Sequence, residues 1–233
     1  MGAIRRLGIR GICALLIASG CSSTSPSSTS PPGAPSASLG IPAASAALYI
    51  STGFLPQVTF PFPAGWTIDV DEPAEWRILP TGSTHAGAED GTSDAIAIHV
   101  RIAASAADCS GVPQPGVSQA PTDIATYWAQ LPGLATTAPQ PVTIGGLTGV
   151  VLDIGMSKSW TKPCPYSGGT PTVPLIVGLT NTNLDQPIQA GWSARVYLLG
   201  LNGGTLAIYV QDVSGGSHFT EYGAIVQTFQ FRR

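Results

Sequence analysis

The dipeptide Asn202-Gly203 constrains the fold of this chain more than any other sequence feature. It separates two mostly apolar runs, 192–201 and 205–213. Asn and Gly adopt the positive φ angles that a two-residue turn needs, so this stretch predicts a β-hairpin. The two runs are then neighbouring antiparallel strands, and an antiparallel sheet is the first element of the fold that the sequence indicates.

Further strands follow the same signals of alternating apolar residues and turns rich in Gly and Pro. Strands 141–146 and 147–154 meet around Gly145-Gly146 and form a second predicted pair. The remaining predicted strands are 58–62 and 66–70, joined as a hairpin, then 76–80, 95–102 and 228–231. Along 95–102 the predicted core-facing residues are Ile96, Ile98, Val100 and Ile102, and the half-exposed ones are Ala95, Ala97, His99 and Arg101.

Two helices complete the predicted secondary structure. The first has Thr122 or Asp123 as its N-cap and ends before Pro132-Gly133. Its apolar residues recur at helical spacing: Ile124, Tyr127, Trp128 and Leu131. The second spans 217–227. The predicted fold class is therefore α+β, an antiparallel β-sheet with two main helices packed on one of its faces.

The N-terminal segment has the layout of a secretory signal peptide. Three arginines precede an uncharged run, 11–18, which is too short to span a bilayer. Small residues then lead to Cys21, and the segment resembles the lipobox of bacterial lipoproteins. The resemblance implies cleavage after residue 20 and a lipid anchor on Cys21, although Ala18 stands where such proteins usually carry leucine. Plain secretion is the alternative, and export by the Sec or the twin-arginine route is left open.

The chain divides into three predicted parts. Residues 1–20 form the signal peptide, 21–50 a lipid-anchored linker and 51–233 a single α+β domain. The linker consists almost wholly of Ser, Thr, Pro, Ala and Gly, a composition that buries too little apolar surface to fold. We therefore expect a domain tethered to the extracytoplasmic face of the cell membrane.

The charge of the chain excludes one class of partner. Charged residues make up 10% of the sequence, and the formal net charge is −3. Nucleic acids attract clustered Lys and Arg, which this chain lacks. We expect no nucleic-acid binding.

Cys109 and Cys164 remain once Cys13 leaves with the signal peptide and Cys21 carries lipid. An even pair of cysteines in an exported protein is typical of a disulfide. We predict a Cys109–Cys164 bond, with two free thiols as the alternative.

The residues able to carry chemistry form no familiar catalytic pattern. The acidic residues that gather in the first half of the domain are Asp69, Asp71, Glu72, Glu75, Glu89, Asp90 and Asp94, and their spacing does not match an EF-hand loop. His85, His99 and His218 are scattered, and the sequence has no nucleophile elbow, zinc pair or phosphate loop. We expect solvated carboxylates, His99 at the surface, and no metal, cofactor or catalytic residue.

Trp160, Tyr166 and Trp192 lie in or near Gly- and Pro-rich loops. Aromatic side chains serve both in cores and at binding surfaces. These three are the expected ligand or partner surface, with plain packing as an equal alternative. The aromatic residues expected in the core are Trp66, Trp76 and Trp128.

Three segments together resemble the PsbP-like superfamily. They are the opening 60–66 (Phe-Pro-Phe-Pro-Ala-Gly-Trp), the stretch 141–146, and the terminal helix that leads into 228–231. The resemblance covers about residues 55–232 and implies an antiparallel sheet packed between helices, in a protein that is a non-catalytic adaptor or binding protein. It assigns no functional residue to a position of this chain.

These observations favour a lipid-anchored extracytoplasmic domain that binds a protein or a small apolar ligand. One alternative is an enzyme acting on cell-envelope material, with His99 or a carboxylate of the acidic loops as its base. Another is a structural surface protein. A pocket in which titratable side chains converge with a nucleophile would favour the enzyme, and the absence of any pocket or exposed apolar patch would favour the structural protein.

Overall fold

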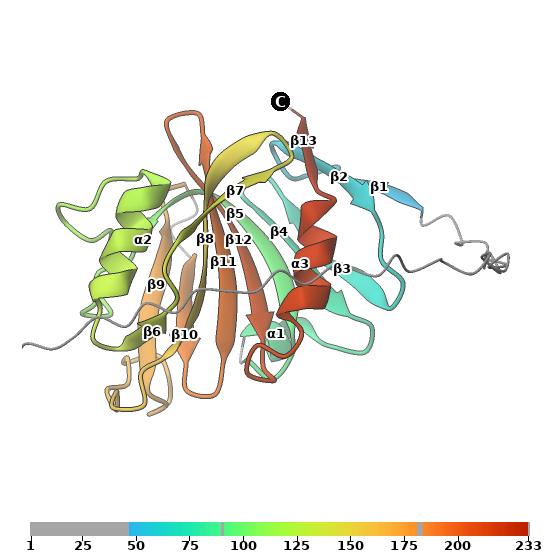
Figure 1. The fold of residues 1–233 in the computed structure, drawn as a ribbon. Coiled ribbons are helices and arrows are strands. Elements are labelled where there is room, and N and C mark those ends of the chain that lie inside the picture. The colour runs from blue at the N-terminus through green and yellow to red at the C-terminus, as the bar shows by residue number, and fades with distance from the viewer. Residues whose placement is uncertain (1–46, 90, 181–183, 233) are drawn as a thin grey trace, which may run out of the picture. The chain divides into compact units, whose positions relative to one another are not determined.

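Strands dominate the computed structural model, which describes residues 47–89, 91–180 and 184–232 (Figure 1). Cys21, the signal peptide and the linker up to residue 46 lie outside the described residues. The strands are β1 (Leu48–Ile50), β2 (Gln57–Pro61), β3 (Trp66–Glu72), β4 (Glu75–Pro80), β5 (Ala95–Ala104), β6 (Leu134–Thr136), β7 (Gln140–Ile144), β8 (Leu147–Met156), β9 (Thr172–Gly178), β10 (Asp185–Gln189), β11 (Ser193–Leu201), β12 (Gly204–Asp212) and β13 (Gln230–Arg232). The helices are α1 (His85–Glu89), α2 (Pro121–Gln130) and α3 (Phe219–Gln227). None of the described helices has the length and apolarity to cross a membrane.

The strands form two sheets, and every pair of named strands is antiparallel. The larger sheet has the order β10-β9-β5-β12-β11-β8-β6, with β4 also beside β5, β3 beside β4 and β7 beside β8. The smaller sheet has the order β1-β2-β13. The predicted antiparallel sheet is confirmed, and β1 occupies the last three residues of the expected linker.

Two of the three hairpins predicted from glycine-containing turns are present. β11 and β12 pair along their whole length around Asn202 and Gly203, whose φ angles are 52° and 80°. β7 and β8 meet in the same way at Gly145 and Gly146, with φ angles of 54° and 81°. Left-handed φ angles at both turn residues match the right-handed twist of the flanking strands.

The predicted pairing of 58–62 with 66–70 is wrong. β2 pairs with β1 and β13, whereas β3 pairs with β4 in the other sheet. The reason lies in packing: Phe60 on β2 stacks edge-on against Trp76 and Phe229, with ring centroids 5.3 and 4.8 Å apart. These contacts place β2 in a layer over the larger sheet, and Gly65 ends a connection between sheets.

A bulge in β5 turns part of the strand over. Val100 pairs with Leu206 and Ile102 with Thr205, so Arg101 is the extra residue, and its φ angle is +51°. An extra residue reverses the direction of the side chains that follow it. Ile102 therefore packs in a different core from Val100, contrary to the single predicted face.

Two hydrophobic cores lie on opposite faces of the larger sheet. Along β11, Tyr197 and Leu199 belong to the first core, and their neighbours Val196 and Leu198 belong to the second. α3 and the smaller sheet cover the first core, whereas α2 covers the second (Figure 1). The two helices thus pack on different faces, which corrects the expectation that they share one.

The helix boundaries differ from the prediction by a few residues. α2 has Ala120 as its N-cap and Pro121 as its first residue, so Thr122 and Asp123 lie inside the helix. Proline suits this first position because its missing N–H has no partner there in any helix. α3 lies within the predicted 217–227, and β13 begins two residues after the predicted start of the last strand.

Candidate functional site

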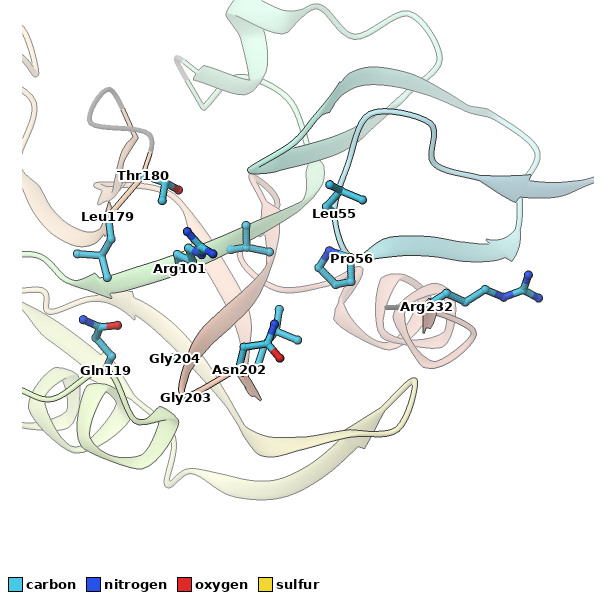
Figure 2. A pocket seen from close by; sticks show the side chains of 12 residues that line it. Leu55, Pro56, Arg101, Gln119, Leu179, Thr180, Asn202, Gly203, Gly204 and Arg232 are labelled. Carbon is cyan, nitrogen blue, oxygen red and sulfur yellow. The ribbon is translucent and has the colours of Figure 1, made fainter.

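A cavity of about 880 Å³ opens where six separate segments of the domain meet (Figure 2). The segments are residues 55–56, 100–101, 119, 179–180, 201–204 and 232. They belong to the connection before β2, the bulge of β5, the approach to α2, the connection after β9, the β11–β12 turn and β13. We call this space the Arg101 cavity. Its volume lies within the range typical of small-molecule sites.

The loop 51–56 forms one wall of the Arg101 cavity and is held by Asp71. The Asp71 carboxylate accepts backbone amides of Thr52, Gly53 and Phe54 at 2.8 to 3.0 Å. Burial by itself would raise the pKa of Asp71, but these hydrogen bonds outweigh it and lower the pKa. Phe54 is buried in the first core, and the next residue, Leu55, is 65% exposed. The anchored loop therefore holds a large apolar side chain in solvent.

The bulge of β5 supplies the charged residue of the cavity. Arg101 is exposed, while the residues on either side of it are buried. Its backbone carbonyl accepts the amide of Leu179 at 2.9 Å, which ties the connection after β9 to the bulge. Leu179 is 36% exposed and lines the cavity opposite the loop that carries Leu55 (Figure 2).

Thr205, next to the β11–β12 turn, fixes the remaining side of the cavity. Its buried hydroxyl donates to the backbone carbonyl of Gln119 at 2.6 Å. This bond joins the segment before α2 to the start of β12, and it sets Gln119 beside the turn at Asn202. The polar groups that line the cavity are thus amides, one hydroxyl and two guanidinium groups.

The arginines of the domain fall into two kinds. Arg77 bonds Asp69 at 2.7 Å, and Arg195 binds Asp153 through two bonds of 2.6 and 2.9 Å. In contrast, Arg101 forms no ion pair within the described part of the chain, and no carboxylate is among the residues that line its cavity. The Arg101 cavity therefore combines exposed leucines with uncompensated positive charge.

The three aromatic residues expected as a binding surface lie in different settings. Trp192 is 7% exposed and belongs to the second core. Trp160 donates its indole N–H to the carbonyl of Thr172 at 3.0 Å and lines a smaller cavity of about 340 Å³. Tyr166 is 49% exposed. Trp192 thus has a packing role, and Trp160 alone of the three lines this smaller cavity.

The predicted disulfide is present. Cys109 and Cys164 are bonded, with their Cα atoms 5.6 Å apart. The bond joins the loop between β5 and α2 to the loop between β8 and β9. Gln119, at the far end of the first loop, lines the Arg101 cavity, but neither cysteine does, so we assign the disulfide a structural role.

The expected core tryptophans and solvated acids are partly corrected. Trp76 and Trp128 are buried, but Trp66 is half-buried. Several of the acids surround the buried Arg77, which lies within 4.0 Å of Asp69, Glu75 and Glu89. Burial raises the pKa of Glu75 despite the nearby guanidinium. These carboxylates form an ion-pair cluster around one arginine, whereas Asp90 lies outside the described residues.

His99 is buried, which makes the expectation of a surface residue wrong. It is 1% exposed, and neither ring nitrogen has a hydrogen-bond partner among the described residues. Burial, reinforced by the positive charge of Arg77, lowers the pKa of His99 to about 3. The alternation along 95–102 suggested an outer face for His99 because it did not show that both faces of β5 are covered.

A second cluster joins Asp94, which precedes β5, to the turn between β12 and α3. It consists of Asp94, Asp212 and His218, and each offers a possible metal-ligating atom within 4.8 Å of the other two. Asp212 accepts backbone amides of Ser214 and His218 at 2.7 Å. Asp94 accepts the hydroxyl of Tyr222 at 2.6 Å and an amide of the same turn at 2.9 Å. All four carboxylate oxygens thus bond this turn or α3, and the cluster fastens α3 to the sheet.

Comparisons with known proteins add little to this geometry. No family model matches the chain, and no curated protein matches it. Similar solved structures include a protein of Bacteroides thetaiotaomicron VPI-5482, with a TM-score of 0.37 and 10% identity over 76% of this chain and 45% of that one. The chain therefore spans less than half the length of this relative.

Two further structures are similar to the same degree. The cyanobacterial PsbP (CyanoP) of Synechocystis sp. PCC 6803 has a TM-score of 0.37 and 9% identity over 80% of this chain and 94% of its own. The Ran-binding protein Mog1p of Saccharomyces cerevisiae has a TM-score of 0.35 and 11% identity over 75% and 89%. A PsbP protein is thus among the structural neighbours, and likeness at this level transfers no function to the chain.

Proposed function

We propose that this chain is a lipid-anchored extracytoplasmic protein whose domain binds a small, largely apolar ligand without catalysing a reaction. The Arg101 cavity is the proposed binding site. The observation that carries the proposal is a cavity of about 880 Å³ beside Leu55 and Leu179, two leucines that the fold leaves exposed. Exposed large apolar side chains around a concave surface are typical of a binding site.

The lining of the cavity supports binding over catalysis. General acid–base catalysis needs a titratable group within hydrogen-bond reach of the reacting atoms. The residues that line the Arg101 cavity include no carboxylate, imidazole or thiol. His99, the base considered for an enzyme, is buried outside this lining, and Asp69, Glu75 and Glu89 pair with Arg77. A purely structural role does not account for a cavity of this size beside exposed leucines.

A neutral fluorescent probe tests the binding site. N-phenyl-1-naphthylamine should bind the purified protein saturably, with an increase in fluorescence. Leu179→Asp should weaken binding about tenfold or more, because burying one leucine contributes about 1.5–3 kcal/mol and the new carboxylate must be desolvated. Val112→Asp is the matched control, since Val112 is 49% exposed and lies outside the cavity.

Two outcomes contradict a small-ligand site. Absence of saturable binding by the wild-type protein is one. The other is equal loss of binding in the Leu179→Asp and Val112→Asp variants, which would place the probe elsewhere. If the wild-type protein binds a protein partner but not the probe, and Leu179→Asp loses that partner, the adaptor alternative would be favoured.

The anchor has a test of its own. Mass spectrometry should find a diacylglyceryl-modified Cys21 at the mature N-terminus, and Cys21→Ala should release the protein from membranes. An unmodified N-terminus downstream of residue 21 would replace the anchor with plain secretion.

A further inference from the structure

We infer that the ligand of the Arg101 cavity carries a negatively charged head group, bound by Arg101, on an apolar body. The inference rests on the proposed function and adds the chemical class of the ligand. The proposed ligand class is the anionic amphiphiles, whose head group is a carboxylate or a phosphate.

The first argument is charge. In a chain of formal net charge −3, positive charge is scarce, with ten Lys and Arg residues in 233. The structure neutralises Arg77 and Arg195 with carboxylates. It leaves Arg101 without an ion pair among the described residues, in a cavity whose lining carries no negative charge. A guanidinium presents five N–H donors, and an anion matches them best.

The second argument is the backbone at Arg101. Its φ of +51° is a left-handed conformation that favours glycine, and a residue with a side chain there costs about 1 kcal/mol. Such strain gathers at sites where a side chain must be aimed in one direction. Here the bulge directs the single long cationic side chain of β5 into the cavity.

The third argument is the arrangement around the guanidinium. Figure 2 shows the Arg101 side chain between Leu179 on one side and Pro56 on the other. The Arg232 side chain extends away from this group in the same view. Arg101 is therefore the cation that lies between the apolar residues lining the two sides of the cavity in this view, which suits a ligand with a charged end and an apolar remainder.

Matched ligands with the same alkyl chain test this class. Dodecanoate, dodecyl phosphate and the neutral dodecanol would each compete against N-phenyl-1-naphthylamine on the full protein. At least one of the two anions should compete about tenfold or more better than dodecanol, since a hydrogen bond to a charged group is worth at least that factor. The advantage should shrink as salt rises, because the site is exposed. The stronger of the two anions identifies the head group.

Variants then assign the effect to Arg101. Arg101→Gln should remove the advantage of the anion over dodecanol, so that the ratio of the two affinities falls to about one. Lys158→Gln removes an exposed positive charge outside the cavity and should retain the advantage. Arg101→Gly should also lose the advantage, with a thermal midpoint no lower than that of the wild type, since glycine relieves the left-handed strain.

The outcomes separate the inference from the proposed function. If the probe binds but dodecanol competes as well as both anions, the anionic class is wrong and the apolar site stands. An anion advantage that persists in Arg101→Gln also overturns the inference. Failure of the wild-type protein to bind the probe or any of the three ligands overturns both.

Discussion

At the scale of single residues, Gly91 shows why Trp192 has a packing role. Gly91 has a φ of +66°, and a Cβ atom placed on it would lie 1.6 Å from Cε2 of Trp192. The loop backbone therefore rests directly on the indole ring. An aromatic face covered in this way is closed to a ligand.

Gly91→Ala should destabilise the domain strongly. Overpacking costs about 1–3 kcal/mol, and the left-handed φ adds about 1 kcal/mol for a residue with a Cβ. Gly82→Ala is the matched control, because Gly82 has a φ of +95° and no atom within 4 Å of the added Cβ. Urea unfolding of both variants separates clash from backbone strain. Equal losses of stability would show that the ring moves aside without cost.

Asp71 is the residue on which the exposed position of Leu55 depends. Tyr49 and Thr52 donate their hydroxyls to the same carboxylate, each at 3.0 Å. Asp71→Asn keeps the shape but replaces one acceptor oxygen with an N–H donor. We expect a loss of about 2–3 kcal/mol in unfolding free energy, since hydrogen bonds to charged groups are worth about 1.5–3 kcal/mol each.

The same variant should weaken probe binding, because the loop 51–56 loses its anchor. Glu72→Gln removes a charge from the adjacent exposed residue and is the control. The pKa of Asp71 is lowered in the folded protein, so its contribution is present above pH 3.8 and is lost as the pH falls through the lowered value. Unchanged stability of Asp71→Asn at pH 7 would contradict this account.

At the scale of elements, the sequence was most informative where structure is decided locally. The turn at Asn202-Gly203 and the apolar spacing of α2 each depend on a few adjacent residues, and both predictions are confirmed. The pairing of β2 was wrong because it depends on Phe229, a residue far along the chain. The sequence has no glycine at the bulge that could have predicted it. The shift of Ile102 to the opposite face of the sheet therefore had no local signal.

The Arg101 cavity had no local signal either. Its lining comes from residues that are far apart in the sequence, such as Leu55, Arg101 and Leu179, and the tertiary fold brings them to one cavity. Each is an ordinary surface residue in its own segment. A hint that sequence reasoning could have used is the shortage of positive charge, which makes any arginine without a nearby acidic residue notable.

The disulfide is the element-scale feature with the clearest energetic effect. It closes a loop between residues 55 positions apart, which limits the unfolded chain and should stabilise the domain by about 4 kcal/mol on the chain-entropy model. A Cys109→Ser, Cys164→Ser double variant should lose about that much in denaturant unfolding. Probe binding to the folded variant should be unchanged, since neither cysteine lines the Arg101 cavity and the hydrogen bond from Thr205 holds Gln119 in its lining. Loss of binding without loss of stability would contradict the structural role.

At the scale of the whole molecule, one sheet separates two cores, and burial on both faces has an electrostatic consequence. Coverage of both faces of β5 places His99 in a site without solvent or a hydrogen-bond partner among the described residues. Glu75 lies opposite His99 in the register of β4 and β5, but its carboxylate lies near the Arg77 guanidinium. The positive charge of Arg77 adds to the effect of burial on His99. The charged form of the imidazole is therefore disfavoured in the folded state.

This predicts that global stability falls in mild acid. The pKa of His99 is lowered from 6.5 to about 3, so the unfolded chain binds a proton below pH 6.5 that the folded chain does not. Between pH 6.5 and pH 4.5 the resulting penalty grows to about 2.7 kcal/mol, at about 1.36 kcal/mol for each pH unit. Burial raises the pKa of Glu75, which opposes this trend. The effect of His99 is thus best isolated by comparing variants.

His99→Leu replaces the titrating imidazole with an apolar side chain of similar bulk. Urea unfolding of this variant and of the wild type, at several pH values between 7 and 4.5, measures the two slopes. The difference in unfolding free energy between the proteins should shift by about 2–3 kcal/mol in favour of the variant across this range, whatever the stability of the variant at pH 7. Parallel slopes would mean that the folded protein admits a proton at His99. That result would require the covered face of β5 to open to solvent, so the experiment tests the packing of the molecule as a whole.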